Sequence, residues 1–88
     1  MPKLKAAQIK PGMWGIEITG RIVRNGDKKV VKTRFGPATV SWAVLEDDTG
    51  SIQLNLWREQ SDRVKTGDFV RLVNAFVKVY KGEMELNI

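Results

Sequence analysis

A small all-β fold, in which five strands close into a barrel, is predicted by three features of the sequence. The chain has 88 residues, which suits one domain. Apolar and polar residues alternate in several separate segments, a spacing typical of half-buried strands. Glycines and short polar turns separate these segments. A barrel leaves no free strand edges and lets one thin aliphatic core serve every strand.

The first half of the chain contains two of the expected strands. Apolar residues at alternate positions predict a strand over 14–23, and Gly20 marks a bulge or a sharp bend within it. A polar turn follows. The second strand covers Lys28–Thr33, breaks near Gly36-Pro37 and resumes from Ala38 to Glu46.

The second half contains three further strands. Ser51–Trp57 alternates cleanly, and 58–65 has little β character and predicts one or two helical turns. Asp68–Tyr80 is a long strand whose buried parity switches near Asn74-Ala75, which predicts a bulge. Glu83–Ile88 is the last strand. Five strands with a helical connection between the third and fourth predict an OB-fold, with an SH3-like barrel as the main rival.

Composition excludes several classes of function. The chain has no cysteine and no histidine, which removes disulfides, thiol nucleophiles, Cys or His metal ligands and the usual proton shuttle. No apolar run approaches the roughly 20 residues that span a bilayer, and no signal-peptide core follows Met1. We expect one domain over 1–88, with its core from about residue 8 and an N-terminal extension over 1–7. We expect a cytoplasmic, nucleoid-associated protein without a cofactor or a metal.

Positive charge is concentrated in the first half of the chain. Residues 1–45 hold nine basic and two acidic side chains (net +7), whereas residues 46–88 hold six and eight (net −2). Such a focused field suits a polyanion such as nucleic acid, or an anionic membrane surface. A solvated loop that keeps the protein soluble is the alternative. The basic residues within 21–34 are Arg21, Arg24, Lys28, Lys29, Lys32 and Arg34.

Three aromatic residues fall on the outward parity of their strands. If the aliphatic residues of the third and fourth strands point inward, Trp57, Phe76 and Tyr80 point outward. Exposed rings can stack on unpaired bases for about 1–3 kcal/mol each, while nearby cations hold the phosphates. Alternatively, the rings cover a barrel end or form a subunit interface. The candidate nucleic-acid-binding residues are the rings Trp57, Phe76, Tyr80 and Trp42 and the cations Arg24, Lys28, Lys32, Arg34, Lys78 and Lys81.

The other aromatic residues have different expected roles. Trp42 lies outside if the small residues of its strand face the interior, and in the core if they do not. Trp14 is expected to plug the bottom of the barrel. Phe35 either clamps a base or anchors the basic loop, and Phe69 is expected to pack in the core.

The acidic residues give little support to catalysis. Asp47 and Asp48 are adjacent in a turn, where carboxylates commonly accept hydrogen bonds from backbone N–H groups. Glu83 and Glu85 share a strand face, and we expect them to shape the edge of the binding face or to repel misplaced phosphate. The sequence has no P-loop and no nucleophile elbow. We therefore predict a binding protein that is not an enzyme.

Several segments together resemble a known family. They are Ile9-Lys10-Pro11-Gly12-Met13, Leu45-Glu46-Asp47-Asp48-Thr49-Gly50-Ser51-Ile52, Leu54-Asn55-Leu56-Trp57, Lys65-Thr66-Gly67-Asp68, Asn74-Ala75-Phe76 and Tyr80-Lys81-Gly82. Over about residues 8 to 87 the chain is similar to the single-OB single-stranded-DNA-binding proteins of archaea and their human relatives. The Asp-Asp-Thr-Gly turn is also shared with the OB domains of replication protein A.

The resemblance implies roles for particular residues. In that family three aromatic residues stack on DNA bases, and by position they correspond to Trp57, Phe76 and Tyr80. Phe76 stands where crenarchaeal members often have Trp, which keeps a ring but changes its area. Those members usually continue into a Gly-rich tail with an acidic end that contacts other proteins. The sequence stops at Ile88, directly after the last expected strand. Either such a tail was removed or this member lacks one, so the resemblance implies DNA binding and leaves partner recruitment open.

The sequence therefore predicts sequence-tolerant binding of single-stranded DNA by a monomer, in replication, recombination and repair. Two alternatives stay open. One is an OB module that binds RNA or tRNA through the same sheet. The other is an OB domain of a replication protein A-like complex, which buries these rings against a partner chain.

Overall fold

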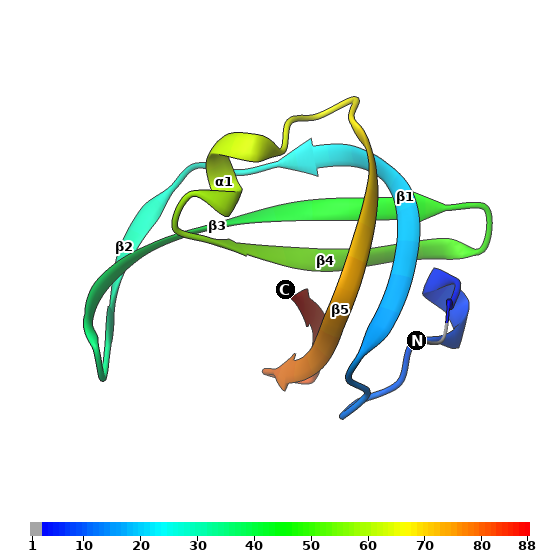
Figure 1. Ribbon diagram of the computed structural model, residues 1–88, viewed down its shortest axis with the longest axis horizontal. Helices are drawn as coiled ribbons and strands as arrows, with labels where there is room; N and C mark the ends of the chain where they lie inside the picture. Colours follow the sequence, from blue (N-terminus) through cyan, green and yellow to red (C-terminus); the bar gives the residue numbers. More distant parts are fainter. Residues whose placement is uncertain (1–2) are drawn as a thin grey trace.

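One sheet of six strands, with two short helical segments, forms the protein (Figure 1). The computed structural model describes residues 3–88. The elements are the 3-10 helix η1 (Ala6–Gln8), β1 (Ile16–Asn25), β2 (Lys29–Thr33), β3 (Gly36–Asp47), β4 (Gly50–Trp57), α1 (Gln60–Arg63), β5 (Phe69–Tyr80) and β6 (Glu83–Asn87).

The sheet closes on itself through β1. The strand order is β1-β5-β6-β4-β3-β2, and β1 pairs with β3 as well as with β5. All neighbours are antiparallel except β4 and β6, which pair in parallel through Gln53 with Glu85 and Leu54 with Leu86. The helix α1 connects β4 to β5, as the sequence predicted. This closed topology is that of the predicted OB-fold.

β1 serves two partners because it bends sharply. Its register with β3 shifts between Ile22 and Arg24, so a bulge lies at this point. Of the bulge and the sharp bend that the sequence suggested at Gly20, the bulge lies further along the strand, after Ile22. A Cβ atom at Gly20 would lie 2.7 Å from the carbonyl oxygen of Glu46 and 2.9 Å from a methyl carbon of Leu45. Glycine therefore permits close contact between β1 and β3 where the sheet closes.

The second expected strand is in fact two strands. β2 and β3 form an antiparallel hairpin that pairs Lys29 with Val40 and Thr33 with Gly36, and it projects from the body in Figure 1. The sequence interpretation took Gly36-Pro37 as a break within one strand. The chain instead reverses direction at Arg34 and Phe35, just before Gly36. There the N–H of Phe35 donates to Thr33 Oγ1 over 3.1 Å.

The predicted parity switch in β5 is confirmed. Val73 and Asn74 are both exposed, Leu72 and Ala75 on either side are buried, and Asn74 has a φ of 55°. The register with β1 shifts at this position. The bulge bends β5 so that one strand contributes to both halves of the closed sheet.

The core is aliphatic and lies inside the closed sheet. Its fully buried large side chains are Ile16, Ile18, Ile22, Leu45, Leu54, Leu56 and Leu86. Ala6 and Ile9, which precede β1, join this cluster. Val79, which shares its parity with buried Val77, is half exposed near the end of β5. None of the helices within residues 3–88 has the length and apolar character needed to cross a bilayer.

Two aromatic residues expected in the core lie outside it. Trp14 is 80% exposed because β1 begins at Ile16 and Gly15, with a φ of 64°, interrupts the alternation before the strand. Phe69 is 68% exposed because Val70 and Leu72 point toward the core. Side chains alternate along the strand, so Phe69 points away from the core.

Candidate nucleic-acid interface

The outward side chains of β3, β4, β6 and β5 form one continuous surface. In register, Trp42 on β3 lies beside Asn55 on β4, and Phe76 on β5 lies beside Asn87 on β6. Leu54, Leu56 and Leu86 point to the core from the same strands. Strand alternation therefore places the predicted rings on the outer face.

A groove of about 500 Å³ runs across this surface. The groove is lined by Trp57 and Tyr80, which are two of the three predicted stacking rings. Trp42, the possible fourth ring, lines it as well. The other residues that line it are Asp27, Lys29, Val31, Val40, Ser41, Gln53, Asn55 and Glu85.

Trp42 lies on the outer face, which resolves its two alternatives. It is partly exposed and its ring rests directly on the turn after β1, because a Cβ atom at Gly26 would lie 2.2 Å from its Nε1 atom. The N–H of Gly26 also donates to the Trp42 carbonyl over 2.8 Å. The guanidinium carbon of Arg24 lies 5.9 Å from the ring centroid, within the range of a cation–π contact.

Trp57 is held in place from two sides. Its indole Nε1–H donates to Asn87 Oδ1 over 3.1 Å, and its backbone N–H donates to Gln60 Oε1 over 2.9 Å. The side chain is half-buried and is fixed before any ligand arrives. A ring fixed in this way loses little conformational freedom when a base stacks on it.

Phe76 and Tyr80 follow each other along the outer face of β5. Tyr80 is exposed, and the Nζ atom of Lys81 lies 5.4 Å from its ring centroid. Phe76 is half-buried outside the groove, with the Nζ atom of Lys78 at 5.7 Å from its ring centroid. Phe76 therefore extends the aromatic surface past the groove along β5.

The predicted cations divide between several places. Arg24 contacts Trp42, and Lys28 forms an ion pair with Asp62 that connects the start of the hairpin to α1. In the backbone register of the hairpin, Lys32 lies opposite Pro37. Strand alternation puts the Lys32 side chain on the face of the hairpin opposite to Lys29 and Val31. Sequence reasoning missed Lys29, the lysine that lines the groove. Its position depends on the hairpin register, which places it beside Val40.

The tip of the hairpin exposes Phe35. The ring is 85% exposed and lies 5.7 Å from the guanidinium carbon of Arg34. Of the two roles considered for Phe35, anchoring of the loop is wrong, because the backbone turn closes through Thr33 Oγ1 without burying the ring.

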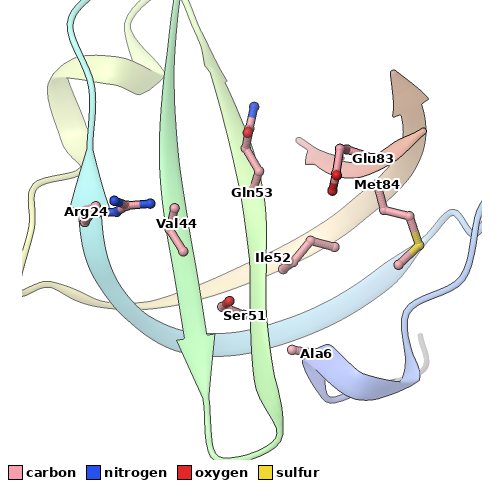
Figure 2. A pocket seen from close by; sticks show the side chains of 8 residues that line it. All are labelled: Ala6, Arg24, Val44, Ser51, Ile52, Gln53, Glu83 and Met84. Atoms are coloured by element: carbon pink, nitrogen blue, oxygen red, sulfur yellow. The ribbon is translucent and has the colours of Figure 1, made fainter. Parts of the chain in front are cut away.

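A second hollow, of about 360 Å³, continues the surface beyond Gln53, which lines both cavities. Figure 2 shows Arg24 on β1 and Glu83 on β6 on opposite sides of this hollow, with Val44 and Ile52 between them. The candidate surface is therefore basic toward β1 and β2, through Arg24 and Lys29, and acidic toward β6, through Glu83 and Glu85.

The acidic turn before β4 stabilises the fold, away from the groove. Asp47 accepts hydrogen bonds from the N–H groups of Ala6 and Thr49, both over 2.8 Å, and Asp48 pairs with Lys5. Burial alone raises the pKa of Asp47, but its hydrogen bonds from Thr49, Ala6 and Gly50 lower that pKa below the usual range. Within residues 3–88, no cluster of three or more acidic side chains is arranged to hold a metal ion.

The family is established by comparison with known proteins. Residues 9–88 match the family model described as single-stranded DNA binding protein Ssb-like, OB fold. The chain belongs to this Ssb-like OB-fold family. The domain is therefore related to single-stranded DNA binding and replication factor A proteins, and its family is one of binding domains and not of enzymes.

Individual relatives agree with this assignment. The chain is 31% identical over 83 residues to the single-stranded DNA binding protein Ssb of Saccharolobus solfataricus, an alignment that covers 94% of this chain and 56% of that protein. It is 30% identical over 73 residues to Replication factor A of Methanothermobacter thermautotrophicus, covering 82% of this chain and 9% of that protein. The chain thus spans about half or less of the length of these two relatives.

A solved structure gives the same result for the fold. The second OB-fold domain of replication protein A from Methanococcus maripaludis superposes with a TM-score of 0.81 at 30% identity, covering 97% of this chain and 87% of that one. The OB-fold predicted from the strand pattern is confirmed.

Proposed function

We propose that this domain binds single-stranded DNA with little overall sequence preference, by stacking bases on Trp57, Phe76 and Tyr80, with Trp42 as a fourth ring. The observation that carries this proposal is the groove in which Trp42, Trp57 and Tyr80 meet a basic hairpin. Every base has a flat face, so stacking on such rings is sequence-tolerant and contributes about 1–3 kcal/mol per base.

The backbone of the strand would be held by cations around these rings. Lys29 lines the groove, Lys78 and Lys81 lie beside Phe76 and Tyr80, and Arg24 contacts Trp42. Lys28, Lys32 and Arg34 add positive charge around the hairpin, where Lys28 is paired with Asp62 and Lys32 lies on the face opposite to Lys29. A surface of this size suits about four or five nucleotides, the low end for an OB-fold. Four neutralised phosphates predict a log–log salt slope of about −3.

The names of the relatives support a role in DNA metabolism. A domain related to Replication factor A and to a single-stranded DNA binding protein would protect exposed strands during replication, recombination and repair. We propose that it does so as a monomer, associated with the nucleoid.

Titration with a fluorescently labelled dT oligomer, followed by anisotropy, tests this function. The expected result is saturable binding that weakens steeply with salt. An excess of matched RNA in competition measures the DNA preference. Absence of binding, together with self-association of the free protein, would instead indicate that the rings form a protein interface.

The two phenylalanines of β5 provide a matched control. Phe76→Ala removes a proposed stacking ring and should weaken dT binding by about 5- to 150-fold, according to the cost of losing one stacked base. Phe69→Ala removes the same side chain from the first residue of the same strand, where it lines a separate hollow with Asp47 and Asp48. It should change affinity less than twofold. Equal losses in both variants would contradict the proposed site.

A further inference from the structure

The floor of the groove is a hydrogen-bond network whose orientation is fixed by its end members. The indole of Trp57 can only donate, and it points to Asn87 Oδ1. An ionised carboxylate can only accept, so Gln53 and Asn55 must turn their NH₂ groups toward Glu85. The distances are 3.1 Å from Gln53 Nε2 to Glu85 Oε2 and 2.9 Å from Asn55 Nδ2 to Glu85 Oε1.

The network uses its own donors internally. Gln53 Nε2 also donates to Asn55 Oδ1 over 3.2 Å, and Asn55 Nδ2 also donates to Asn87 Oδ1 over 3.5 Å. All four amide hydrogens of Gln53 and Asn55 therefore have acceptors within the network. Each carboxylate oxygen of Glu85 accepts one of these bonds and keeps the capacity for another. The floor consequently presents acceptors to the groove.

We propose, on the basis of the proposed function, that Glu85 reads the edge of one stacked base and favours bases with hydrogen-bond donors. Guanine offers two adjacent donors, N1–H and the N2 amino group, which match the two oxygens of a carboxylate. Cytosine and adenine each offer one amino group. Thymine offers a single N3–H between two carbonyl oxygens, which the carboxylate repels. Proteins read unpaired bases through hydrogen bonds to such edges.

The position of Glu85 fits this role. It lines the same groove as Trp57 and Tyr80, so a base that stacks on either ring can turn an edge toward the strands beneath. A carboxylate on the floor disfavours phosphate there, whereas Lys29 lines the same groove from the hairpin. The groove therefore orients the strand with bases inward and phosphates toward the basic edge.

A purely structural role for Glu85 makes a different prediction. The network connects β4 to β6, so its loss could change stability and weaken the binding of every oligomer equally. A reading role changes the ranking of the bases and not only the mean affinity. The ranking is therefore the decisive measurement.

The test uses dT pentamers in which one thymine is replaced by guanine, inosine or cytosine at each of the five positions in turn. At the best position, the guanine pentamer should bind the native protein about 5- to 100-fold more tightly than the all-thymine pentamer, the discrimination of a bidentate contact. Inosine keeps N1–H but lacks the amino group, so it should fall between them. Equal affinities for guanine and thymine at all five positions would overturn the inference.

Two variants separate base reading from charge. Glu85→Gln should reduce the guanine preference to less than twofold. Glu83→Gln removes the same charge two residues earlier on β6, and it should raise affinity for all pentamers similarly while keeping their ranking. Loss of the ranking in Glu83→Gln, or its survival in folded Glu85→Gln, contradicts the inference. If Glu85→Gln does not fold, as judged by its melting curve, the guanine, inosine and thymine series on the native protein still decides.

Failure of the inference and failure of the proposed function give different results. Tight binding that ignores base identity overturns only base reading by Glu85. Absence of binding to every pentamer and to a longer dT oligomer overturns both.

Discussion

The outer faces of two strand pairs, β4 with β6 and β1 with β5, both expose aromatic and charged side chains, but only the first has the features of an interface. On β1 and β5, Phe69 is exposed beside a hollow that Asp47 and Asp48 also line, and Arg71 already pairs with Glu17 at 3.1 Å. That hydrogen bond lowers the pKa of Glu17 and raises that of Arg71, so the two charges are committed to each other.

On β4 and β6, by contrast, a fixed ring faces a groove next to a basic hairpin. Trp57 is held by Asn87, and Lys29 lines the same groove without an acidic partner among the ion pairs of residues 3–88. An exposed ring is therefore a weak sign of function by itself. A ring in a hollow, orientated in advance and accompanied by an available cation, is a much stronger one.

Trp57→Ala should give the largest effect, because it removes the fixed ring that distinguishes the face of β4 and β6. Loss of a stacking platform should weaken dT binding by about 5- to 150-fold, equivalent to about 1–3 kcal/mol. The ring is only half-buried, so the melting temperature should change little. Anisotropy with a labelled oligomer measures affinity independently of the lost indole. A large drop in melting temperature with unchanged affinity would show that Trp57 belongs to the core.

Gly26→Ala tests whether the position of a second ring, Trp42, matters for binding, because it displaces that ring without removing it. The new methyl group would lie 2.2 Å from Trp42 Nε1, so the indole must shift. We expect a stability loss of about 1–3 kcal/mol, typical of overpacking, together with weaker dT binding. In the double variant Gly26→Ala with Trp42→Ala, stability should recover and affinity should not. Recovery of both would exclude Trp42 from the interface.

Asp47→Ala should affect stability without affecting binding. The carboxylate connects η1 to the turn before β4, and loss of its hydrogen bonds should cost about 1–3 kcal/mol of unfolding free energy at pH 7. Its folded pKa is lowered, so this stabilisation is present above the unfolded pKa of 3.8 and is lost as pH falls through the folded value. Denaturation curves of native and variant protein should converge at low pH. Unchanged dT affinity at pH 7 completes the test.

Lys29→Ala and Lys28→Ala should give the smallest effects and differ from each other. Lys29 lines the groove, so its loss should reduce the salt slope by about 0.7, the value for one phosphate contact on a single strand. Lys28 is already paired with Asp62, so its loss should change the slope less. Salt titrations of the two variants side by side measure this difference. A larger change in Lys28→Ala would mean that DNA displaces Asp62.

Local alternation was sufficient to predict much of the fold and part of the site. The parity of Ser51–Trp57 and the bulge at Asn74 placed Trp57 and Phe76 outside, because side chains alternate within a strand whatever its partners are. The sequence could not place Lys29, since its neighbour Val40 is set by hairpin register. Nor could it find the network on Glu85, which depends on parallel pairing between β4 and β6, 32 residues apart at Gln53. Trp14 was misplaced because Gly15 interrupts the alternation before β1.

The hydrogen bond between Trp57 and Asn87 spans 30 residues and joins the indole on β4 to β6. The indole therefore acquires its final environment only when β6 docks. If the other tryptophans, Trp14 and Trp42, are replaced by phenylalanine, Trp57 becomes the sole indole fluorophore. Its change in emission during refolding would then measure the rate at which the sheet closes.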